Sequence, residues 1–99
     1  MRPIHLVQLD KTRPAVLLTR ERFRSVSSRV TVAPITSVIR GISTEVPVGL
    51  ANGLESPSVV SCDNIATVRN DMIGRHIGYL LAEQETALTD AILLAFDLE

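Results

Sequence analysis

Residues 4–19, Ile-His-Leu-Val-Gln-Leu-Asp-Lys-Thr-Arg-Pro-Ala-Val-Leu-Leu-Thr, decide the fold of this chain. Two short apolar runs, residues 4–9 and 15–19, flank a polar cluster that begins at Asp10. Runs of this length and composition are typical of β-strands, and a short polar connection joins antiparallel neighbours. Pro14 fits because it stands at the first position of the second strand. The stretch therefore predicts a β-hairpin whose second strand is buried on both faces.

Further short apolar runs extend the predicted sheet. Strand character is found in residues 30–37, 44–48, 58–62 with a continuation through 65–68, and 73–80. Pro34 marks an edge or a bend in the first of these runs. Residues 20–28 are rich in Arg and Ser and lack a clean period, so they predict a loop or at most one helical turn.

The C-terminal segment has a helical period instead. Its apolar residues recur at helical spacing and are Leu88, Ala91, Ile92, Ala95 and Phe96. This spacing predicts an amphipathic helix of about four turns that packs on an apolar surface. Short strands followed by one helix predict a β-rich α+β fold, namely a small, curved, SH3-like barrel of about six strands with a C-terminal helix.

Composition limits the classes of protein to consider. With 99 residues, 45% of them hydrophobic, residues 1–99 are expected to form a single domain. A domain this small has little stability to spare, which favours a homodimer. The single cysteine, Cys62, excludes an intrachain disulfide framework and suits a reducing compartment, so we expect a cytoplasmic protein. Neither a transmembrane helix nor a secretory signal is predicted.

The net charge of −1 conceals an uneven distribution. Residues 1–50 carry eight basic groups against three acidic ones, whereas residues 51–99 carry two against eight. Nine of the ten basic groups are Arg, whose planar fork suits bidentate binding of phosphate. One face of the domain is therefore a candidate anion-binding surface. The alternative is that these charges only solvate the two halves of a neutral domain.

Several kinds of chemistry lack their usual residues. His5, His76 and Cys62 have no neighbouring ligands at metal-binding spacing, so no metal site is expected. The sequence has no glycine-rich phosphate loop and no Gly-x-Ser-x-Gly nucleophile motif. Nucleotide hydrolysis and acyl transfer are therefore not indicated, and no cofactor is expected.

Polar residues remain at the predicted strand ends, where a small curved sheet brings them to one rim. They are Arg13, Thr36, Ser37, Asp63 and Asn64. Such a set suits phosphodiester cleavage, in which a carboxylate or water removes the ribose 2′-OH proton and an Arg stabilises the transition state. A hydroxyl and an amide can orient the scissile phosphate. Each residue also has an ordinary structural explanation as a solvated or turn residue.

Five short blocks follow one another along nearly the whole chain. They are Arg13-Pro14-Ala15-Val16-Leu17-Leu18, Val32-Ala33-Pro34-Ile35-Thr36-Ser37 with Ile39-Arg40-Gly41, Thr44-Glu45-Val46-Pro47, Ser58-Val59-Val60-Ser61-Cys62-Asp63-Asn64 with Thr67-Val68, and Ile77-Gly78-Tyr79-Leu80. Their order and spacing resemble the MazF/PemK family of toxin endoribonucleases. The resemblance implies a homodimer that cuts single-stranded RNA without a metal and leaves 2′,3′-cyclic phosphate and 5′-hydroxyl ends. It also implies a cognate antitoxin that neutralises the toxin.

The resemblance assigns roles to individual residues. Arg13 and Thr36 correspond to the main catalytic pair of the family, Ser37 to a phosphate contact, and Asp63 to an acid that some members use as general base. The family's glutamate-containing loop before the Arg-Pro block is missing here, and Ala66 replaces an RNA-contacting arginine. The shorter loop implies a more open cleft, which could admit a tRNA or rRNA loop as readily as a message.

Arg20, Arg40 and Arg69 are candidate contacts to the RNA backbone, with ordinary solvated arginines as the alternative. A rival interpretation is a binding module without catalysis, because the same barrel also supports toxins that trap DNA gyrase. The two are distinguished by whether RNA or DNA is damaged.

Overall fold

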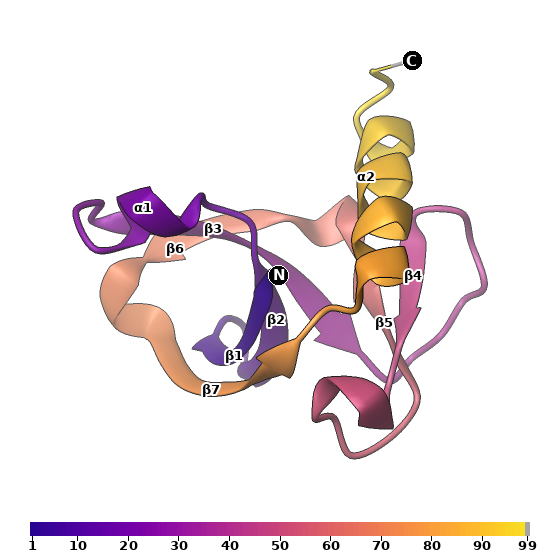
Figure 1. Ribbon diagram of the computed structural model, residues 1–99, viewed down its shortest axis with the longest axis horizontal. Helices are drawn as coiled ribbons and strands as arrows, with labels where there is room; N and C mark the ends of the chain where they lie inside the picture. Colours follow the sequence, from indigo (N-terminus) through magenta and orange to yellow (C-terminus); the bar gives the residue numbers. More distant parts are fainter. Residues whose placement is uncertain (99) are drawn as a thin grey trace.

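The computed structural model describes residues 1–98 and contains seven β-strands and two α-helices (Figure 1). The strands are β1 (Pro3–Gln8), β2 (Thr12–Leu17), β3 (Arg29–Thr36), β4 (Glu45–Val48), β5 (Ser58–Ser61), β6 (Ala66–Arg69) and β7 (Ile73–Tyr79). The helices are α1 (Glu21–Arg24) and α2 (Ala82–Ala95), and three short 3-10 turns are η1 (Leu50–Asn52), η2 (Cys62–Asn64) and η3 (Asn70–Met72). Within residues 1–98 no helix is long and apolar enough to span a membrane.

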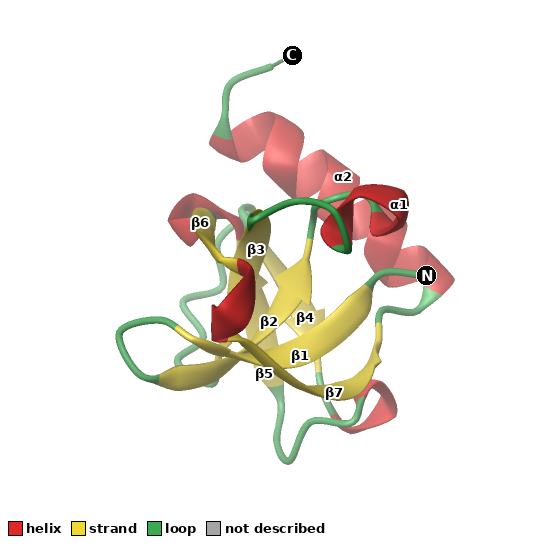
Figure 2. Cartoon of the chain, turned by 90° about the vertical axis from the view of Figure 1, so that its left-hand side faces the viewer, coloured by secondary structure: helices red, strands yellow, loops and turns green. Residues whose placement is uncertain are grey.

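All strand pairs are antiparallel, and the strands follow the order β4-β5-β3-β2-β1-β7, with β6 paired to β3. The β-rich fold with a C-terminal helix is as predicted, and the sheet has seven strands where about six were expected. The predicted run from residue 58 to 68 is divided by η2, so that β5 pairs with the end of β3 and β6 with its beginning. In the described chain the outer strands β4 and β7 do not pair, so the curved sheet is not a closed barrel (Figure 2).

The predicted hairpin is present. Gln8 of β1 pairs with Thr12 of β2, which leaves residues 9–11 as the connecting loop. Arg13 therefore lies inside β2, opposite Val7, and not in the polar connection between the two predicted strands. Because a paired strand fixes the backbone of Arg13, its side chain leaves the sheet in a defined direction.

Two apolar clusters lie on opposite sides of β2. Val16 belongs to the cluster under α2, whereas its neighbours Ala15 and Leu17 belong to the cluster formed with the first half of β3. Successive side chains of a strand alternate between faces. The continuous apolar run of β2 therefore reflects burial on both faces, as predicted.

Helix α2 covers one cluster and lies beside β4 and β5, far from α1 (Figure 1). Leu88 and Ala91 are buried as predicted, and Ile92 and Ala95 are partly buried. The prediction for Phe96 was wrong, because the helix ends at Ala95 and the Phe96 side chain is exposed.

A buried amide pair attaches α2 to the sheet. Asn52 Nδ2 donates to Gln84 Oε1 (2.6 Å) and to the carbonyl of Tyr79 (2.9 Å). Asn52 Oδ1 accepts from Gln84 Nε2 (3.1 Å) and from the backbone N–H of Gly49 (3.0 Å). Since every polar atom of the Asn52 side chain is satisfied, this buried network fixes the start of α2 against η1 and β7.

Candidate active site

The short β1–β2 loop places a carboxylate on the Arg13 guanidinium. Arg13 Nε donates to Asp10 Oδ1 at 2.8 Å and Arg13 Nη2 donates to Asp10 Oδ2 at 2.9 Å. This bidentate pair holds the pKa of Asp10 well below its usual range and raises the pKa of Arg13. Both groups are charged at neutral pH, and within residues 1–98 the Nη1 donors of Arg13 have no hydrogen-bond partner.

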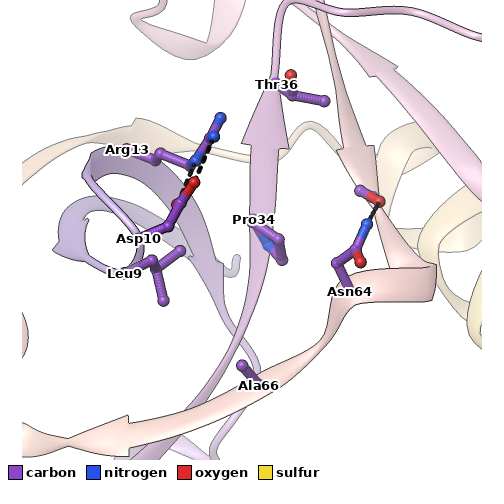
Figure 3. A pocket seen from close by; sticks show the side chains of 8 residues that line it. Leu9, Asp10, Arg13, Pro34, Thr36, Asn64 and Ala66 are labelled. Carbon is purple, nitrogen blue, oxygen red and sulfur yellow. Dashed lines mark hydrogen bonds and ion pairs between the residues drawn. The ribbon is translucent and has the colours of Figure 1, made fainter.

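Arg13 and Asp10 form one wall of a cleft of about 400 Å³. Its lining is Leu9, Asp10, Arg13, Pro34, Thr36, Ser61, Asn64 and Ala66. Figure 3 shows Arg13 and Asn64 on opposite sides of β3, with Pro34 and Thr36 between them. The cleft therefore combines a guanidinium, a hydroxyl and an amide, which are the groups that bind a phosphodiester.

Hydrogen bonds orient the hydroxyl and the amide. Thr36 ends β3, and its Oγ1 accepts from the backbone N–H of Val38 at 3.1 Å. The hydroxyl proton of Thr36 is thus free to be donated to a bound oxygen. Asn64 Nδ2 donates to Ser61 Oγ at 2.8 Å. Thr36 and Asn64 therefore face the cleft with their orientations set by residues close in the sequence.

A second, larger cleft of about 610 Å³ adjoins the first one. Arg13 and Thr36 line both clefts. Ser37 lines only the second one, together with Lys11 and Arg75 among others. Arg13 and Thr36 therefore lie where the two clefts meet. An extended polymer bound across these two residues would occupy one cleft on each side of them.

The structure does not bring Asp63 to either cleft. Asp63 lies in η2, where its Oδ2 accepts from Thr44 Oγ1 at 2.7 Å, while the next residue, Asn64, lines the first cleft. Adjacent side chains of a 3-10 turn point in different directions. This geometry corrects the expectation that Asp63 lies beside Arg13 and Thr36.

The three arginines proposed as backbone contacts are scattered. Arg20 precedes α1 and lies over the ring of Phe23, 4.7 Å from its centroid. Arg40 lies 3.8 Å from Glu45, and Arg69 lies 3.2 Å from Asp71. None of the three lines either cleft.

The charged cleft residues that sequence reasoning missed are Asp10, Lys11, Glu55 and Arg75. Asp10 had a detectable signal, because a carboxylate three residues before Arg13 in a tight hairpin can reach back to it. Lys11 and Arg75 had no signal in the sequence, since their positions depend on the loop and on the pairing of β7.

The Cys62 thiol is not a candidate nucleophile. Burial raises the pKa of the Cys62 thiol to about 11, with the nearby Asp63 charge acting in the same direction, so the thiol stays protonated at neutral pH. Within residues 1–98, no three His, Cys, Asp or Glu side chains lie together as a metal-binding group.

Comparisons with known proteins match nearly the whole chain. Residues 5–96 match the family model for the PemK-like, MazF-like toxin of type II toxin-antitoxin systems. The chain is 61% identical over 99 residues to endoribonuclease MazF3 of Mycobacterium tuberculosis, which covers all of this chain and 96% of that protein.

Solved structures show the same fold. The Mycobacterium tuberculosis toxin MazF-mt6 has a TM-score of 0.96 at 60% identity and covers 99% of both chains. A mycobacterial endoribonuclease solved in complex with its cognate antitoxin has a TM-score of 0.86 at 21% identity, covering 98% of this chain and 93% of that one. Since the family model spans nearly the whole chain and the relatives align end to end, the chain belongs to the PemK-like, MazF-like family of type II toxin-antitoxin toxins.

Proposed function

We propose that this toxin is an endoribonuclease that cuts RNA at a phosphodiester held between Arg13 and Thr36. The observation that carries the proposal is that these two residues line both clefts, so an RNA strand crossing them places one phosphate at the junction. The full-length relative at 61% identity, which is named an endoribonuclease, supports this activity.

The proposed reaction needs no external nucleophile. A carboxylate base takes the proton of the ribose 2′-OH, the 2′-oxygen attacks the adjacent phosphorus, and the bond from phosphorus to the 5′-oxygen breaks. The leaving oxygen takes a proton from water. The products are a 2′,3′-cyclic phosphate and a 5′-hydroxyl end, and no metal or cofactor takes part.

Arg13 and Thr36 act on the phosphate oxygens. The free Nη1 donors of Arg13 bind a nonbridging oxygen whose charge grows in the transition state, which makes the hydrogen bond strongest there. The Thr36 hydroxyl donates to a second oxygen and fixes the phosphate for in-line attack. Asn64 is assigned to the same phosphate from the opposite wall of the first cleft.

Asp10 is the better-placed candidate for the base, since it lines the first cleft and Asp63 does not. While Asp10 is bound to Arg13, its lowered pKa makes it a weak base. A phosphate that engages the guanidinium weakens this pair and returns the pKa of Asp10 toward its usual range. Substrate binding would therefore activate the base, and Asp63 is the rival to be tested against it.

Four further residues are assigned to RNA outside the reaction centre. Ser37 lines the second cleft and is assigned to RNA that leaves the reaction centre on that side. Arg20, Arg40 and Arg69 lie outside both clefts, and we propose them only as distant contacts of a larger folded RNA, such as a tRNA or rRNA loop.

We further propose that the toxin works in the cytoplasm as a homodimer and is neutralised by a cognate antitoxin. The family match supports the antitoxin, because toxins of this kind belong to two-component systems. The small size of the domain supports the dimer. A monomer in sedimentation at micromolar concentration would contradict it.

The test is to incubate the purified protein with total RNA in EDTA and to map new 5′-hydroxyl ends, with Arg13→Ala beside it. Discrete cuts that vanish in the variant support the proposal and give the cleavage motif. If RNA stays intact and DNA instead acquires protein-linked double-strand breaks in the presence of gyrase, the toxin belongs to the gyrase-targeting class.

A further inference from the structure

A β-bulge beside the site determines where Arg75 points. Val7 of β1 pairs with Ile73 of β7, and His5 pairs with His76, so Gly74 and Arg75 both stand opposite Leu6. One extra residue on one strand is a β-bulge, a feature that redirects side chains and is common next to active sites.

Gly74 makes this bulge possible. A Cβ atom at Gly74 would lie 3.0 Å from the carbonyl oxygen of Leu6, which is tighter than ordinary contact. The next residue, Arg75, lines the second cleft together with Leu6 and Ile77. The irregular pairing thus places a guanidinium in the cleft that already contains Arg13 and Thr36.

The charge of the second cleft is unbalanced. Lys11, Arg13 and Arg75 line it, against Glu55 as its carboxylate. Within residues 1–98, neither Lys11 nor Arg75 forms an ion pair. Of the eight other arginines, four pair with a nearby acid, and these are Arg13, Arg24, Arg40 and Arg69. Lys11 and Arg75 are therefore cations of the second cleft that form no ion pair within the described residues.

The spacing fits a strand of nucleic acid. Arg13 lies on β2 and Arg75 on β7, with β1 between them. Because neighbouring strands are about 4.8 Å apart, the two backbones are separated by roughly 10 Å. An extended RNA strand whose scissile phosphate lies at Arg13 covers such a distance within a few nucleotides.

We propose that the second cleft is a phosphate subsite, in which Arg75, assisted by Lys11, holds a backbone phosphate flanking the one that is cleaved. The inference rests on the proposed function, since it takes the scissile phosphate to lie at Arg13 and Thr36. Arg75 can donate two parallel hydrogen bonds to one phosphate, and Lys11 adds a point charge. The subsite makes cleavage depend on a minimum length of RNA on one side of the cut.

Binding is tested first, with an RNA that cannot be cleaved. The probe is a short 2′-O-methyl oligonucleotide of random sequence, and its affinity is measured by fluorescence anisotropy over a range of salt concentrations. Arg75→Ala is expected to weaken binding about tenfold. The slope of log affinity against log salt should become shallower by about 0.7, the value for one phosphate contact on a single strand.

Two variants calibrate this result. Arg75→Lys should keep the salt slope and recover part of the affinity, because it retains the charge but not the fork. Arg22→Ala removes an equal charge from α1, where Arg22 lies over the ring of Phe23 and outside both clefts, so it should match wild type. If Arg75→Ala behaves like Arg22→Ala, the subsite is overturned.

Cleavage then identifies the phosphate. A cleavable oligonucleotide carries a neutral methylphosphonate at one flanking position at a time. For the wild-type protein, a methylphosphonate at one of the flanking positions should lower kcat/KM about tenfold. For Arg75→Ala, the methylphosphonate at that position should not lower kcat/KM any further. An equal loss in both proteins would show that Arg75 does not contact that phosphate, and equal losses at every flanking position would overturn the subsite.

The outcomes separate this inference from the proposed function. If wild type cuts RNA, Arg13→Ala does not, and Arg75→Ala equals wild type in binding and kcat/KM, the subsite is wrong and the endoribonuclease stands. If wild type fails to cut any RNA, the endoribonuclease falls, and the assignment of the second cleft beside a scissile phosphate falls with it.

Discussion

Asp10 holds the guanidinium of Arg13 with both carboxylate oxygens, at 2.8 Å from Nε and 2.9 Å from Nη2. Arg13 lies at the junction of two clefts, and Asp10 lines the first of them. The Asp10 carboxylate occupies only one edge of the guanidinium. The Arg13 side chain is therefore already oriented, so that it would lose less freedom on binding the proposed RNA substrate. The same contact keeps the Asp10 carboxylate ionised at neutral pH, in the cleft where we propose that the scissile phosphate binds.

The first prediction concerns Asp10. Asp10→Asn removes both the candidate base and the charge that orients Arg13, so kcat should fall about 100-fold or more. The measurement is single-turnover cleavage of an RNA oligonucleotide containing the mapped motif.

Asp63→Asn is the matched control for Asp10→Asn. It also neutralises one exposed carboxylate, but Asp63 contacts Thr44 rather than the clefts, so kcat should change less than about twofold. If Asp63→Asn lowers kcat about 100-fold and Asp10→Asn changes it less than about twofold, the base is Asp63 and the assignment of Asp10 is wrong.

The second prediction concerns the dependence of stability on pH. Asp10 has a pKa below its ordinary value of 3.8 in the folded state, so its contribution to stability is fully present above that value and is lost as the pH falls toward the folded pKa. The melting temperature of wild type should exceed that of Asp10→Asn at pH 7 by a small amount, because the pair is solvent-exposed. The gap should shrink below about pH 4, and a gap that widens in acid would contradict the pair.

The third prediction concerns the shape of the cation at residue 13. Arg13→Lys keeps the charge but not the two-edged fork that binds Asp10 and phosphate together, so kcat should fall about 100-fold. Circular dichroism should show an unchanged fold, because Arg13 is a partly exposed residue at the start of β2. Activity close to wild type in Arg13→Lys would mean that charge alone suffices.

The fourth prediction concerns the Thr36 hydroxyl. Thr36→Val has nearly the same shape but cannot donate to the phosphate, so kcat should fall about tenfold or more. Thr36→Ser retains the hydroxyl and should recover most of the activity. If Thr36→Val keeps its activity while Thr36→Ser loses it, the methyl group of Thr36 matters rather than its hydroxyl.

The sequence predicted those features that depend on local pattern. The hairpin followed from two apolar runs around a short polar loop, and burial of β2 on both faces followed from the continuous run 15–18. The family resemblance placed Arg13 and Thr36 together, and the two line the same clefts.

The rest depends on geometry that no local pattern encodes. Asp63 and Asn64 are adjacent, and only the 3-10 turn decides which of them faces the cleft. Arg75 reaches the second cleft through a bulge that results from the pairing of β7 with β1, two strands that are distant in the sequence. Phe96 continued the helical period, but the helix ends one residue earlier.

The last prediction tests the attachment of α2 to the sheet. A Cβ atom at Gly78 of β7 would overlap the backbone carbonyl oxygen of Asn52, the residue whose side chain binds Gln84 of α2. Because backbone atoms on both sides cannot move without breaking the amide network, Gly78→Ala should lower the free energy of unfolding by about 3 kcal/mol or more. Gly41→Ala is the control: Gly41 has a φ of +73° but nothing within 4 Å of its Cβ position, so it should cost only about 1 kcal/mol. Urea denaturation measures both values, and a Gly78→Ala cost no larger than that of Gly41→Ala would show that η1 can move away from β7 without loss of the fold.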